Sequence, residues 1–264
     1  ALSSQRTLGR AQDRAGRPDI AALLRAIDAI RDADGRPGIP RVRFVTSHPW
    51  DLTERLIEAM AECESVCEHL HLPVQSGDDE VLRRMGRQYT VEAYLELVQR
   101  LRAAVPGIAL TTDVITGFCG ETDAQFESTL ELLRSVRFEQ VFAAAYSERP
   151  GTPATRLPDD VPPEEKRRRL NELLGVQEDI GRELNEAWLG RRTEVLVDEA
   201  RQPRSHDHEG SESQGPRLVG RNREHKLVHF DGPESMVGTL VETEIVRAGA
   251  YALSGRRIEG ADHA

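Results

Sequence analysis

Two stretches decide how this chain folds: HLHLPVQSGDDEVLRRMGRQYT at residues 69–90 and TTDVITGFCGET at residues 111–122. Each begins as an apolar, strand-like run, passes through a polar loop and continues as a helical pattern. Strands that alternate with helices are typical of βαβ units and a parallel sheet. Because parallel barrels place their chemistry in the loops that follow the strands, we expect function at these two polar strand ends.

Two more strand-like runs flank this pair: RVRFVTS at residues 41–47 and RFEQVFAAAYS at residues 137–147. The second leads through a proline- and glycine-rich loop into a long helical pattern from about residue 164 to residue 187. Together the four runs predict an α/β domain with about four βα units. Four units are part of a parallel (β/α) barrel, since a closed one has eight strands.

Several helix starts carry local signals. Asp19, which follows a proline, is expected to cap an amphipathic helix. Asp51 with Glu54, and Thr122 with Gln125, have the spacing of capping boxes at two later helices. These signals predict a helix after each strand-like run that they follow.

The sequence pattern changes after residue 190, where short apolar runs are joined by turns that contain glycine. The runs are TEVLVDE (193–199), RLVGRN (217–222), KLVHF (226–230) and TLVETEIVRA (239–248). They predict a small all-β, OB-like barrel. We therefore expect a ragged segment at residues 1–18, an α/β domain at 19–188, a barrel at 189–258 and a tail at 259–264.

Composition narrows the class of protein. The chain has 264 residues, of which 38% are hydrophobic and 30% charged, and no apolar run approaches the ~18–20 residues of a membrane span. Its first twenty residues lack the apolar centre of a signal peptide. Three cysteines, an odd number, argue against a disulfide scaffold. We expect a cytoplasmic protein with no membrane partner.

Alternation along the strands separates two faces. Leu70, Leu72 and Val74 share one face, suited to packing beneath helices, and His69, His71 and Gln75 share the other. We expect the two histidines to be buried, hydrogen-bonded residues. Gln75 and Ser76 come at the strand's carboxyl end, and we expect them to contact a ligand there.

The same alternation places Asp113 inside the barrel, on one face with Thr111, Ile115 and Gly117. A carboxylate in that position needs a hydrogen-bond or ionic partner, because an isolated buried charge is very costly. Gly117 and Gly120 allow the backbone to turn tightly and to approach a ligand.

Other polar and thiol groups favour structural interpretations. Cys63 and Cys67 form a C-x3-C pair, but Leu70 stands where a CxxxCxxC motif needs its third cysteine, so we expect small buried thiols. His206 and His208 belong to a polar, low-complexity loop and are not expected to bind a metal. The basic run at residues 166–169 is expected to cover a solvated helix face.

One basic strip favours RNA contact although the formal net charge is −10. Arg217, Arg221, Arg223 and Lys226 lie on adjacent short strands of the predicted barrel, with only Glu224 as an opposing charge. Phosphate contact by such a strip would weaken as salt rises.

The segments HLHLPVQSG, RRMGRQYT, TTDVITGF, GET, YSERPGTPA and LVGRNREHKLVHF occur in an order and spacing that resemble the tRNA methylthiotransferase (MiaB-like) family of radical S-adenosylmethionine (radical SAM) enzymes. DVITGFCGET is similar to the family's DIIVGFPGET segment, with Cys119 where the family usually has proline. The resemblance covers residues from about 19 to 258 and corresponds to the family's C-terminal part.

The resemblance implies a partial radical SAM barrel followed by a TRAM domain that binds tRNA. It implies methylthiolation of C2 of N6-isopentenyladenosine beside the anticodon, with S-adenosylmethionine as methyl donor and radical source. An electron donor such as flavodoxin and [4Fe–4S] clusters would take part. Residues expected to hold S-adenosylmethionine are Gln75, Ser76, Gly77, Asp113, Gly117 and Tyr146. Residues expected to hold the anticodon stem-loop are Arg221, Arg223 and Lys226.

Besides Cys119, this sequence departs from the family in having neither the auxiliary-cluster domain nor the CxxxCxxC strand. We therefore expect a fragment that is inactive alone, with no catalytic residue and no metal ligand of its own. The alternatives are an RNA-binding module without catalysis, a sister enzyme acting on threonylcarbamoyladenosine tRNA, and an iron-independent hydrolase or isomerase using Asp113 and His71. The last finds no nucleophile motif in the sequence.

Overall fold

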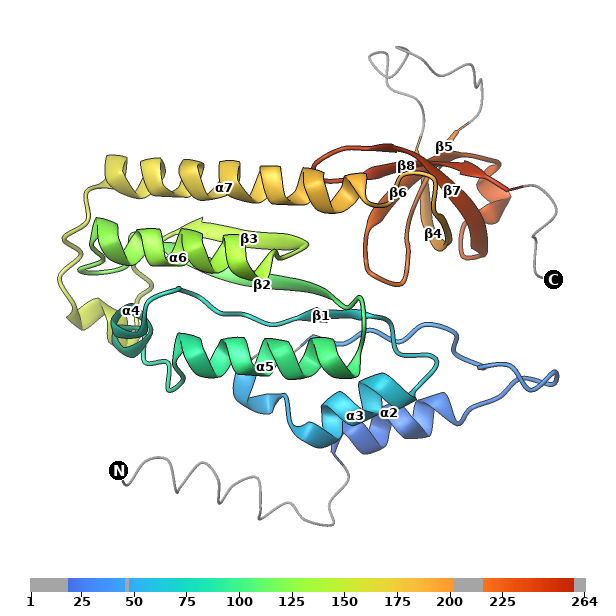
Figure 1. Cartoon of the computed structure of the whole chain (residues 1–264), viewed down its shortest axis with the longest axis horizontal. Helices are drawn as coiled ribbons and strands as arrows, with labels where there is room; N and C mark the ends of the chain where they lie inside the picture. The colour runs from blue at the N-terminus through green and yellow to red at the C-terminus, as the bar shows by residue number, and fades with distance from the viewer. Residues whose placement is uncertain (1–18, 46–47, 202–215, 259–264) are drawn as a thin grey trace. The chain divides into compact units, whose positions relative to one another are not determined.

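The computed structural model describes residues 19–45, 48–201 and 216–258 (Figure 1). The chain divides into two compact units: residues 1–43 with 52–67, and residues 44–51 with 68–264. The described helices are α2 (Ile20–Asp28), α3 (Glu54–Glu62), α4 (Asp79–Arg84), α5 (Val91–Ala104), α6 (Asp123–Val136) and α7 (Pro163–Glu186), with short 3-10 turns η1 (Pro49–Asp51), η2 (Pro153–Arg156) and η3 (Glu234–Met236).

The first unit is a pair of packed helices, α2 and α3. Asp19 caps α2, as expected, by accepting a hydrogen bond from the Ala22 backbone NH. The expected Asp51 cap of α3 is wrong, because Thr53 is the N-cap and residues 49–51 form a separate 3-10 turn.

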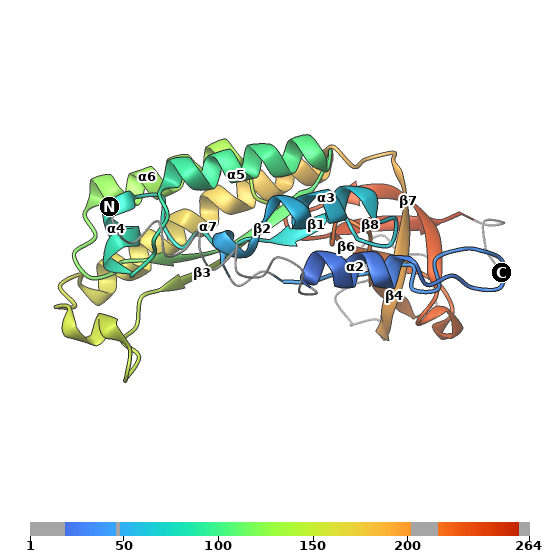
Figure 2. The ribbon, with the colours of Figure 1, turned by 90° about the horizontal axis from the view of Figure 1, so that it is seen from below.

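The second unit contains a parallel sheet in the order β1-β2-β3. Its strands are β1 (His69–His71), β2 (Ala109–Thr116) and β3 (Gln140–Ala145). Helices α5, α6 and α7 lie on one side of it (Figure 2). The residues that face these helices are almost fully buried, including Leu70, Leu72 and Val114, whereas Phe142 on the other face is 51% exposed.

The expectation of about four βα units is only partly met. Among the described residues three strands form this parallel sheet, and residues 41–45, the described part of the expected run at 41–47, contribute isolated bridges instead of a strand. Val42 bridges to Val66 in the first unit and Val45 to His71 in the second. Since these two bridges go to segments that are five residues apart in the chain, no continuous ladder forms along residues 41–45.

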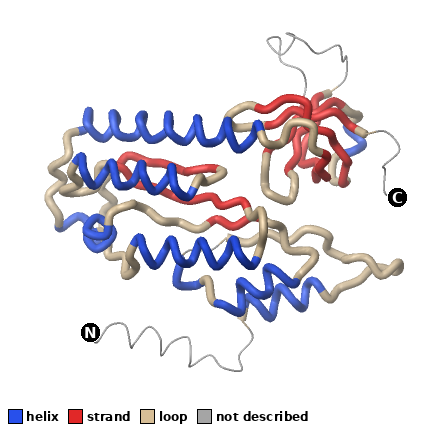
Figure 3. Tube along the Cα trace, in the orientation of Figure 1, coloured by secondary structure: helices blue, strands red, loops and turns tan. Residues whose placement is uncertain are grey.

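The small barrel is closed, in the strand order β4-β5-β6-β8-β7. Figure 3 draws its strands in red. Its strands are β4 (Arg192–Arg201), β5 (Arg217–Arg221), β6 (Leu227–Asp231), β7 (Leu240–Ala248) and β8 (Leu253–Arg257). Side chains from all five strands fill its core, including Val195, Leu218, Phe230, Ile245 and Leu253. The sequence predicted four of these strands; β8, which closes the barrel, was missed.

α7 connects the two halves of the second unit. It begins near the loop after β2, where Lys166 packs against Gly117. It ends beside the barrel, where Asn185 contacts the loop between β7 and β8. α7 is the longest described helix and is rich in charged residues. None of the helices in the described ranges has the length and apolar character needed to cross a membrane.

Candidate functional site

The carboxyl edge of the parallel sheet brings three of the sequence-predicted segments together. The Gln75 backbone NH donates to the Asp113 carbonyl at 2.8 Å, and the Ile115 NH donates to the Gln75 carbonyl at 3.0 Å. The Tyr146 NH donates to the Thr116 carbonyl at 2.8 Å. The ends of β1, β2 and β3 are therefore neighbours, in the place where parallel α/β folds carry ligands.

The turn after β1 is pinned to α6. Gln75 has φ = 73°, a left-handed conformation that is uncommon for a residue with a side chain. The Gly77 NH donates to Thr129 Oγ1 at 3.0 Å, and a Cβ on Gly77 would lie 2.5 Å from the Ser128 carbonyl oxygen. Ser76 is completely buried and Gln75 nearly so. Gly77 is thus required by helix packing, and Ser76 forms part of the turn's interior.

The face of the sheet turned away from the helices carries a polar chain of contacts. His71 Nδ1 lies 2.9 Å from Thr111 Oγ1, and its Nε2 lies 3.4 Å from Asp113 Oδ2. The Phe142 ring meets the His71 ring edge-on at 5.6 Å. This arrangement confirms the predicted alternation, with His71, Thr111 and Asp113 on one face. The Asp113 side chain is 41% exposed, so its carboxylate is accessible to a ligand.

The loop after β2 is organised by a buried ion pair. The Glu121 carboxylate accepts a hydrogen bond from the Gly117 NH at 2.6 Å and one from the Arg169 guanidinium at 2.9 Å. Arg169 also donates to the Glu121 carbonyl at 2.8 Å. Burial raises the pKa of Glu121 above its usual value, against the opposing effect of these donors. The Gly117–Glu121 loop is consequently held by contacts inside the protein.

Lys166 packs against the same loop. A Cβ on Gly117 would lie 2.5 Å from Cγ of Lys166, and Gly117 has φ = 68°. The Lys166 ammonium contacts both Asp159 carboxylate oxygens at 2.6 and 2.7 Å and lies 5.0 Å from the centre of the Tyr146 ring. The expectation that residues 166–169 cover a solvated face is therefore wrong for Lys166 and Arg169, which are buried.

Tyr146 lies where the sequence placed it, directly after β3. Its ring meets Phe118 edge-on at 4.8 Å, and Phe118 belongs to a small apolar cluster with Val81 and Cys119. Desolvation, with a contribution from Cys119, raises the pKa of Tyr146 to about 12. The phenol is therefore a neutral hydrogen-bonding group at physiological pH.

Sequence reasoning missed the residues that hold this edge in place. Glu121 was noticed only as part of the GET segment, and Arg169 and Lys166 only as part of a basic run. The sequence feature that could have indicated them is a loop carboxylate, Glu121, together with a later helix that starts with proline and carries Lys166 and Arg169 one turn apart. Nothing in the local pattern indicated that α7 passes beneath the loop.

The cysteines are buried thiols. Cys63, Cys67 and Cys119 are free and each is almost fully buried. Within the described ranges, no group of three or more His, Cys, Asp or Glu side chains is placed to hold a metal ion. A [4Fe–4S] cluster needs several cysteine thiolates around one position. The cysteines of this chain do not fit that requirement.

The basic strip has more acidic partners than the sequence indicated. Arg223 pairs with Glu68, Lys226 with Glu139, and Arg221 lies 3.9 Å from Asp198. The expectation that Glu224 is the only opposing charge is therefore wrong, because carboxylates distant in sequence supply the counter-charges. Contact with RNA stays a prediction for these residues. His206 and His208 lie outside the described residues.

Known proteins resemble this chain over most of its length. The family model of the radical SAM superfamily matches residues 11–133. A tRNA-2-methylthio-N(6)-dimethylallyladenosine synthase from Alkaliphilus oremlandii is 42% identical over 241 residues, 91% of this chain and 48% of that protein. A protein of the same name from Carboxydothermus hydrogenoformans is 43% identical over 254 residues, 96% of this chain and 54% of that protein.

Among solved structures, coproporphyrinogen III oxidase from Escherichia coli, a radical SAM enzyme, is similar over 62% of this chain and 38% of its own, with 18% identity and a TM-score of 0.49. The present chain spans about half the length of the synthases that it matches. Their similarity to it extends over nine-tenths of its residues. The chain belongs to the tRNA methylthiotransferase family of the radical SAM superfamily.

Proposed function

We propose that this chain forms the cosubstrate-binding and RNA-binding part of a tRNA methylthiotransferase. The reaction would place a methylthio group on C2 of N6-isopentenyladenosine beside the anticodon. The observation that carries the proposal is the meeting of Gln75, Asp113 and Tyr146 at one edge of a parallel sheet. The names of relatives that match most of the chain support the same activity.

The residues at the carboxyl edge fit S-adenosylmethionine. The Asp113 carboxylate can accept hydrogen bonds from ribose hydroxyls, and it is oriented by His71, which Thr111 contacts in turn. Tyr146, neutral and in edge-on contact with Phe118, offers a hydroxyl and an aromatic ring to an adenine. When bound, S-adenosylmethionine would supply the methyl group and the means of hydrogen abstraction.

We further propose different roles for the remaining predicted ligands. Gln75 would contact the cosubstrate, while Ser76, Gly77 and Gly117 would hold the two loops in shape through the α6 and α7 contacts described above. No residue of the described part is proposed as a cluster ligand. Cluster ligation and reduction, with an electron donor such as flavodoxin, would depend on polypeptide other than these residues.

The closed five-stranded barrel is proposed to be a TRAM-like domain that binds the anticodon stem-loop. OB-like barrels of this kind bind oligonucleotides through a strand face and its flanking loops. Arg221, whose side chain is 35% exposed, is the most accessible of the three cations assigned to RNA. An RNA-binding module without catalysis is the second candidate, and it is favoured by the same barrel.

Calorimetric measurement of S-adenosylhomocysteine binding tests the cosubstrate site and does not require a cluster. We expect weak, saturable binding that Asp113→Asn lowers at least tenfold, because a charged acceptor of ribose hydroxyls becomes a neutral one. Glu131→Gln, an exposed change on α6, is the matched control and should bind like the parent chain. If neither the parent chain nor the control binds while both are folded, the cosubstrate proposal fails and the RNA-binding module is left.

Isopentenyladenosine-containing anticodon stem-loop RNA tests the second half of the proposal. We expect the chain to bind it, and the logarithm of the affinity to fall linearly with the logarithm of salt concentration. Equal binding to a stem-loop with unmodified adenosine would favour a module that recognises RNA without its modification. An absence of binding at low salt would contradict both candidates.

A further inference from the structure

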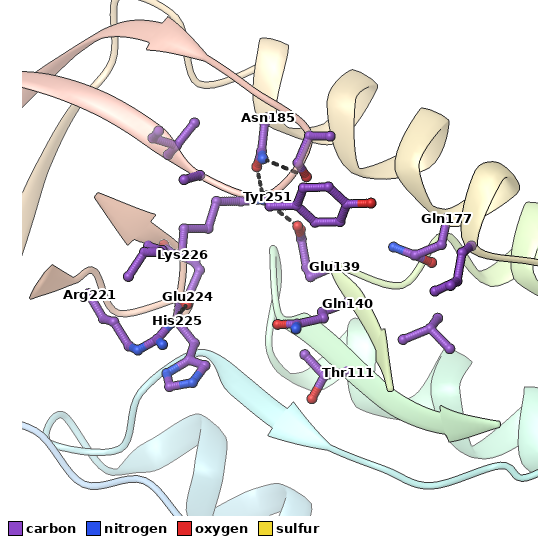
Figure 4. A pocket seen from close by; sticks show the side chains of 16 residues that line it. Thr111, Glu139, Gln140, Gln177, Asn185, Arg221, Glu224, His225, Lys226 and Tyr251 are labelled. Atoms are coloured by element: carbon purple, nitrogen blue, oxygen red, sulfur yellow. Dashed lines mark hydrogen bonds and ion pairs between the residues drawn. The ribbon is translucent and has the colours of Figure 1, made fainter. Parts of the chain in front are cut away.

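The turn between β5 and β6 contacts the amino edge of the parallel sheet. Arg223 forms two hydrogen bonds with the Glu68 carboxylate, at 2.7 and 2.9 Å. Lys226 donates to the Glu139 carboxylate and, at 2.7 Å, to Asn185 Oδ1 (Figure 4). Glu68 directly precedes β1 and Glu139 directly precedes β3. The two cations thus engage the starts of β1 and β3, the two outer strands of the three-stranded sheet, at the edge opposite the proposed cosubstrate site.

Lys226 has lost nearly all its contact with water. It is 8% exposed, and Asn185, which accepts one of its hydrogen bonds, is 6% exposed. Asn185 in turn donates to the carbonyls of Gly249 and Ala250, at 2.7 and 3.3 Å, in the loop between β7 and β8. A desolvated ammonium is tolerated only when paired and hydrogen-bonded. Its network joins the start of β3, the end of α7 and two barrel loops.

The turn itself is built to present these side chains. Asn222 is completely buried, and its Oδ1 accepts the Lys226 backbone NH at 2.8 Å. His225 has φ = 67°, a conformation that costs about 1–2 kcal/mol for a residue with a Cβ, and its ring lies 4.5 Å from that of His69. Arg221 donates to the His225 carbonyl at 3.2 Å.

Side chains do not fill this junction completely. A cavity of about 270 Å³ lies between the sheet and the barrel, lined by Glu139, Gln177 and Tyr251 among others (Figure 4). Where the cavity lies, side chains of the sheet and the barrel do not interlock as they do in a packed core. The ion pairs and their hydrogen bonds supply directional contacts beside this cavity.

We propose that residues 222–226 form a clamp that sets the position of the barrel relative to the sheet. Arg223 and Lys226 are positioning residues in this clamp, and phosphate contact falls to other cations. Paired buried charges specify one register among several, which is their best-attested use. The clamp itself goes beyond the proposed function, and only the assignment of phosphate contact to other cations rests on that function.

Spin-label distances test the clamp without any RNA. Labels on Glu131→Cys in α6 and Ser235→Cys in η3, both exposed positions, report the separation of the two halves. We expect one narrow distribution in the otherwise unchanged chain. Lys226→Glu should broaden it, and the swap that combines Lys226→Glu with Glu139→Lys should narrow it again. Arg247→Glu, an exposed barrel cation outside the turn, is the control.

The second pair keeps the test decisive if one variant unfolds. Arg223→Glu should also broaden the distribution, and adding Glu68→Arg should restore it. Circular dichroism identifies the folded variants. A distribution that stays narrow in folded Lys226→Glu and folded Arg223→Glu would overturn the clamp.

Salt dependence separates positioning residues from phosphate ligands. Each phosphate ligand contributes about 0.7–0.9 to the slope of log affinity against log salt. Lys226→Met and Arg223→Gln should leave the slope for tRNA unchanged, while Arg221→Gln should reduce it. A reduction of about one in either clamp variant would overturn the positioning assignment. If tRNA does not bind at all, the proposed function fails and the distance measurement still decides the clamp.

Discussion

At the scale of single residues, the Glu121–Arg169 pair is the most consequential contact. Both side chains are almost fully buried, and each satisfies backbone groups as well as the other's charge. Arg169 has two further carboxylate partners, Glu165 and Asp123, whereas Arg169 is the cation that contacts the Glu121 carboxylate. Loss of the two partners should therefore have unequal effects.

We expect Arg169→Met to lower the free energy of unfolding by about 3–5 kcal/mol, because it leaves a buried carboxylate without its counter-charge. Glu121→Gln should cost less, since it keeps one acceptor oxygen and Arg169 keeps two carboxylates. Urea unfolding of the two variants at neutral pH gives the comparison. Equal losses would show that Glu121 does not depend on Arg169.

Gly117 makes a second residue-scale prediction with an internal control. Gly117 and Gly107 both have positive φ, of 68° and 79°, but only Gly117 has a neighbour where a Cβ would go. Gly107→Ala should cost about 1–2 kcal/mol from backbone conformation alone. Gly117→Ala should cost about 1–3 kcal/mol more, because Lys166 must move. Thermal or urea unfolding would contradict this if the two losses matched.

The two glycines also show what the sequence could and could not predict at this scale. TGFCGET indicated a tight turn at Gly117, and the positive φ confirms the turn. The atom that demands the glycine belongs to a helix almost fifty residues further along the chain. A local pattern carries the backbone geometry but not the identity of a distant packing partner.

At the scale of elements, helix starts divide in the same way. Thr122 and Gln125 form the predicted capping box of α6. Asp51 and Glu54 have the same spacing, yet the N-cap of α3 is Thr53, two residues after Asp51. Spacing alone cannot choose between adjacent candidate caps when both residue types are good acceptors. Strand β8 was missed for a related reason: Leu253 is its only large apolar side chain.

The two candidate caps of α3 can be told apart by substitution. Thr53→Ala should destabilise the chain by about 1 kcal/mol, because the Leu56 NH loses the acceptor that lies 3.3 Å away. Asp51→Ala should change stability by less than about 0.5 kcal/mol, as expected of an exposed site without a capping role. Denaturant midpoints measured in parallel suffice. A larger loss for Asp51→Ala would restore the cap that the sequence predicted.

At the scale of the whole molecule, folding decides which charged side chains pair with one another. Cations that look available in the sequence, such as Lys226 and Arg223, meet carboxylates from segments far away in the chain. The family, the parallel sheet and most of the barrel followed from local patterns and resemblance. The ionic partners did not, because they depend on which strand starts and helix ends meet in three dimensions.

The pKa values of the tyrosines depend on the whole fold, and they differ between the native and the unfolded chain. The structure describes all four tyrosines, and every one has a raised pKa. Burial raises the pKa of Tyr89 to about 12, and its hydroxyl donates to the Val74 carbonyl at 3.0 Å. Tyr94 is more deeply buried and donates to the Leu72 carbonyl at 2.8 Å. Tyr251 is exposed, and the pKa of its phenol is raised by slight burial and by the nearby Glu178 carboxylate.

Because these pKa values are higher in the folded chain, the unfolded chain releases its phenolic protons first as pH rises. The stabilisation is complete below the unfolded pKa of about 10 and is lost as pH climbs toward about 12. An absorbance titration of tyrosinate should therefore show little ionisation near pH 10 in the native chain, with the unfolding transition following at higher pH. In denaturant, all four should titrate near pH 10. Native-state ionisation of all four near pH 10, with circular dichroism unchanged, would contradict the buried hydroxyl contacts of Tyr89 and Tyr94.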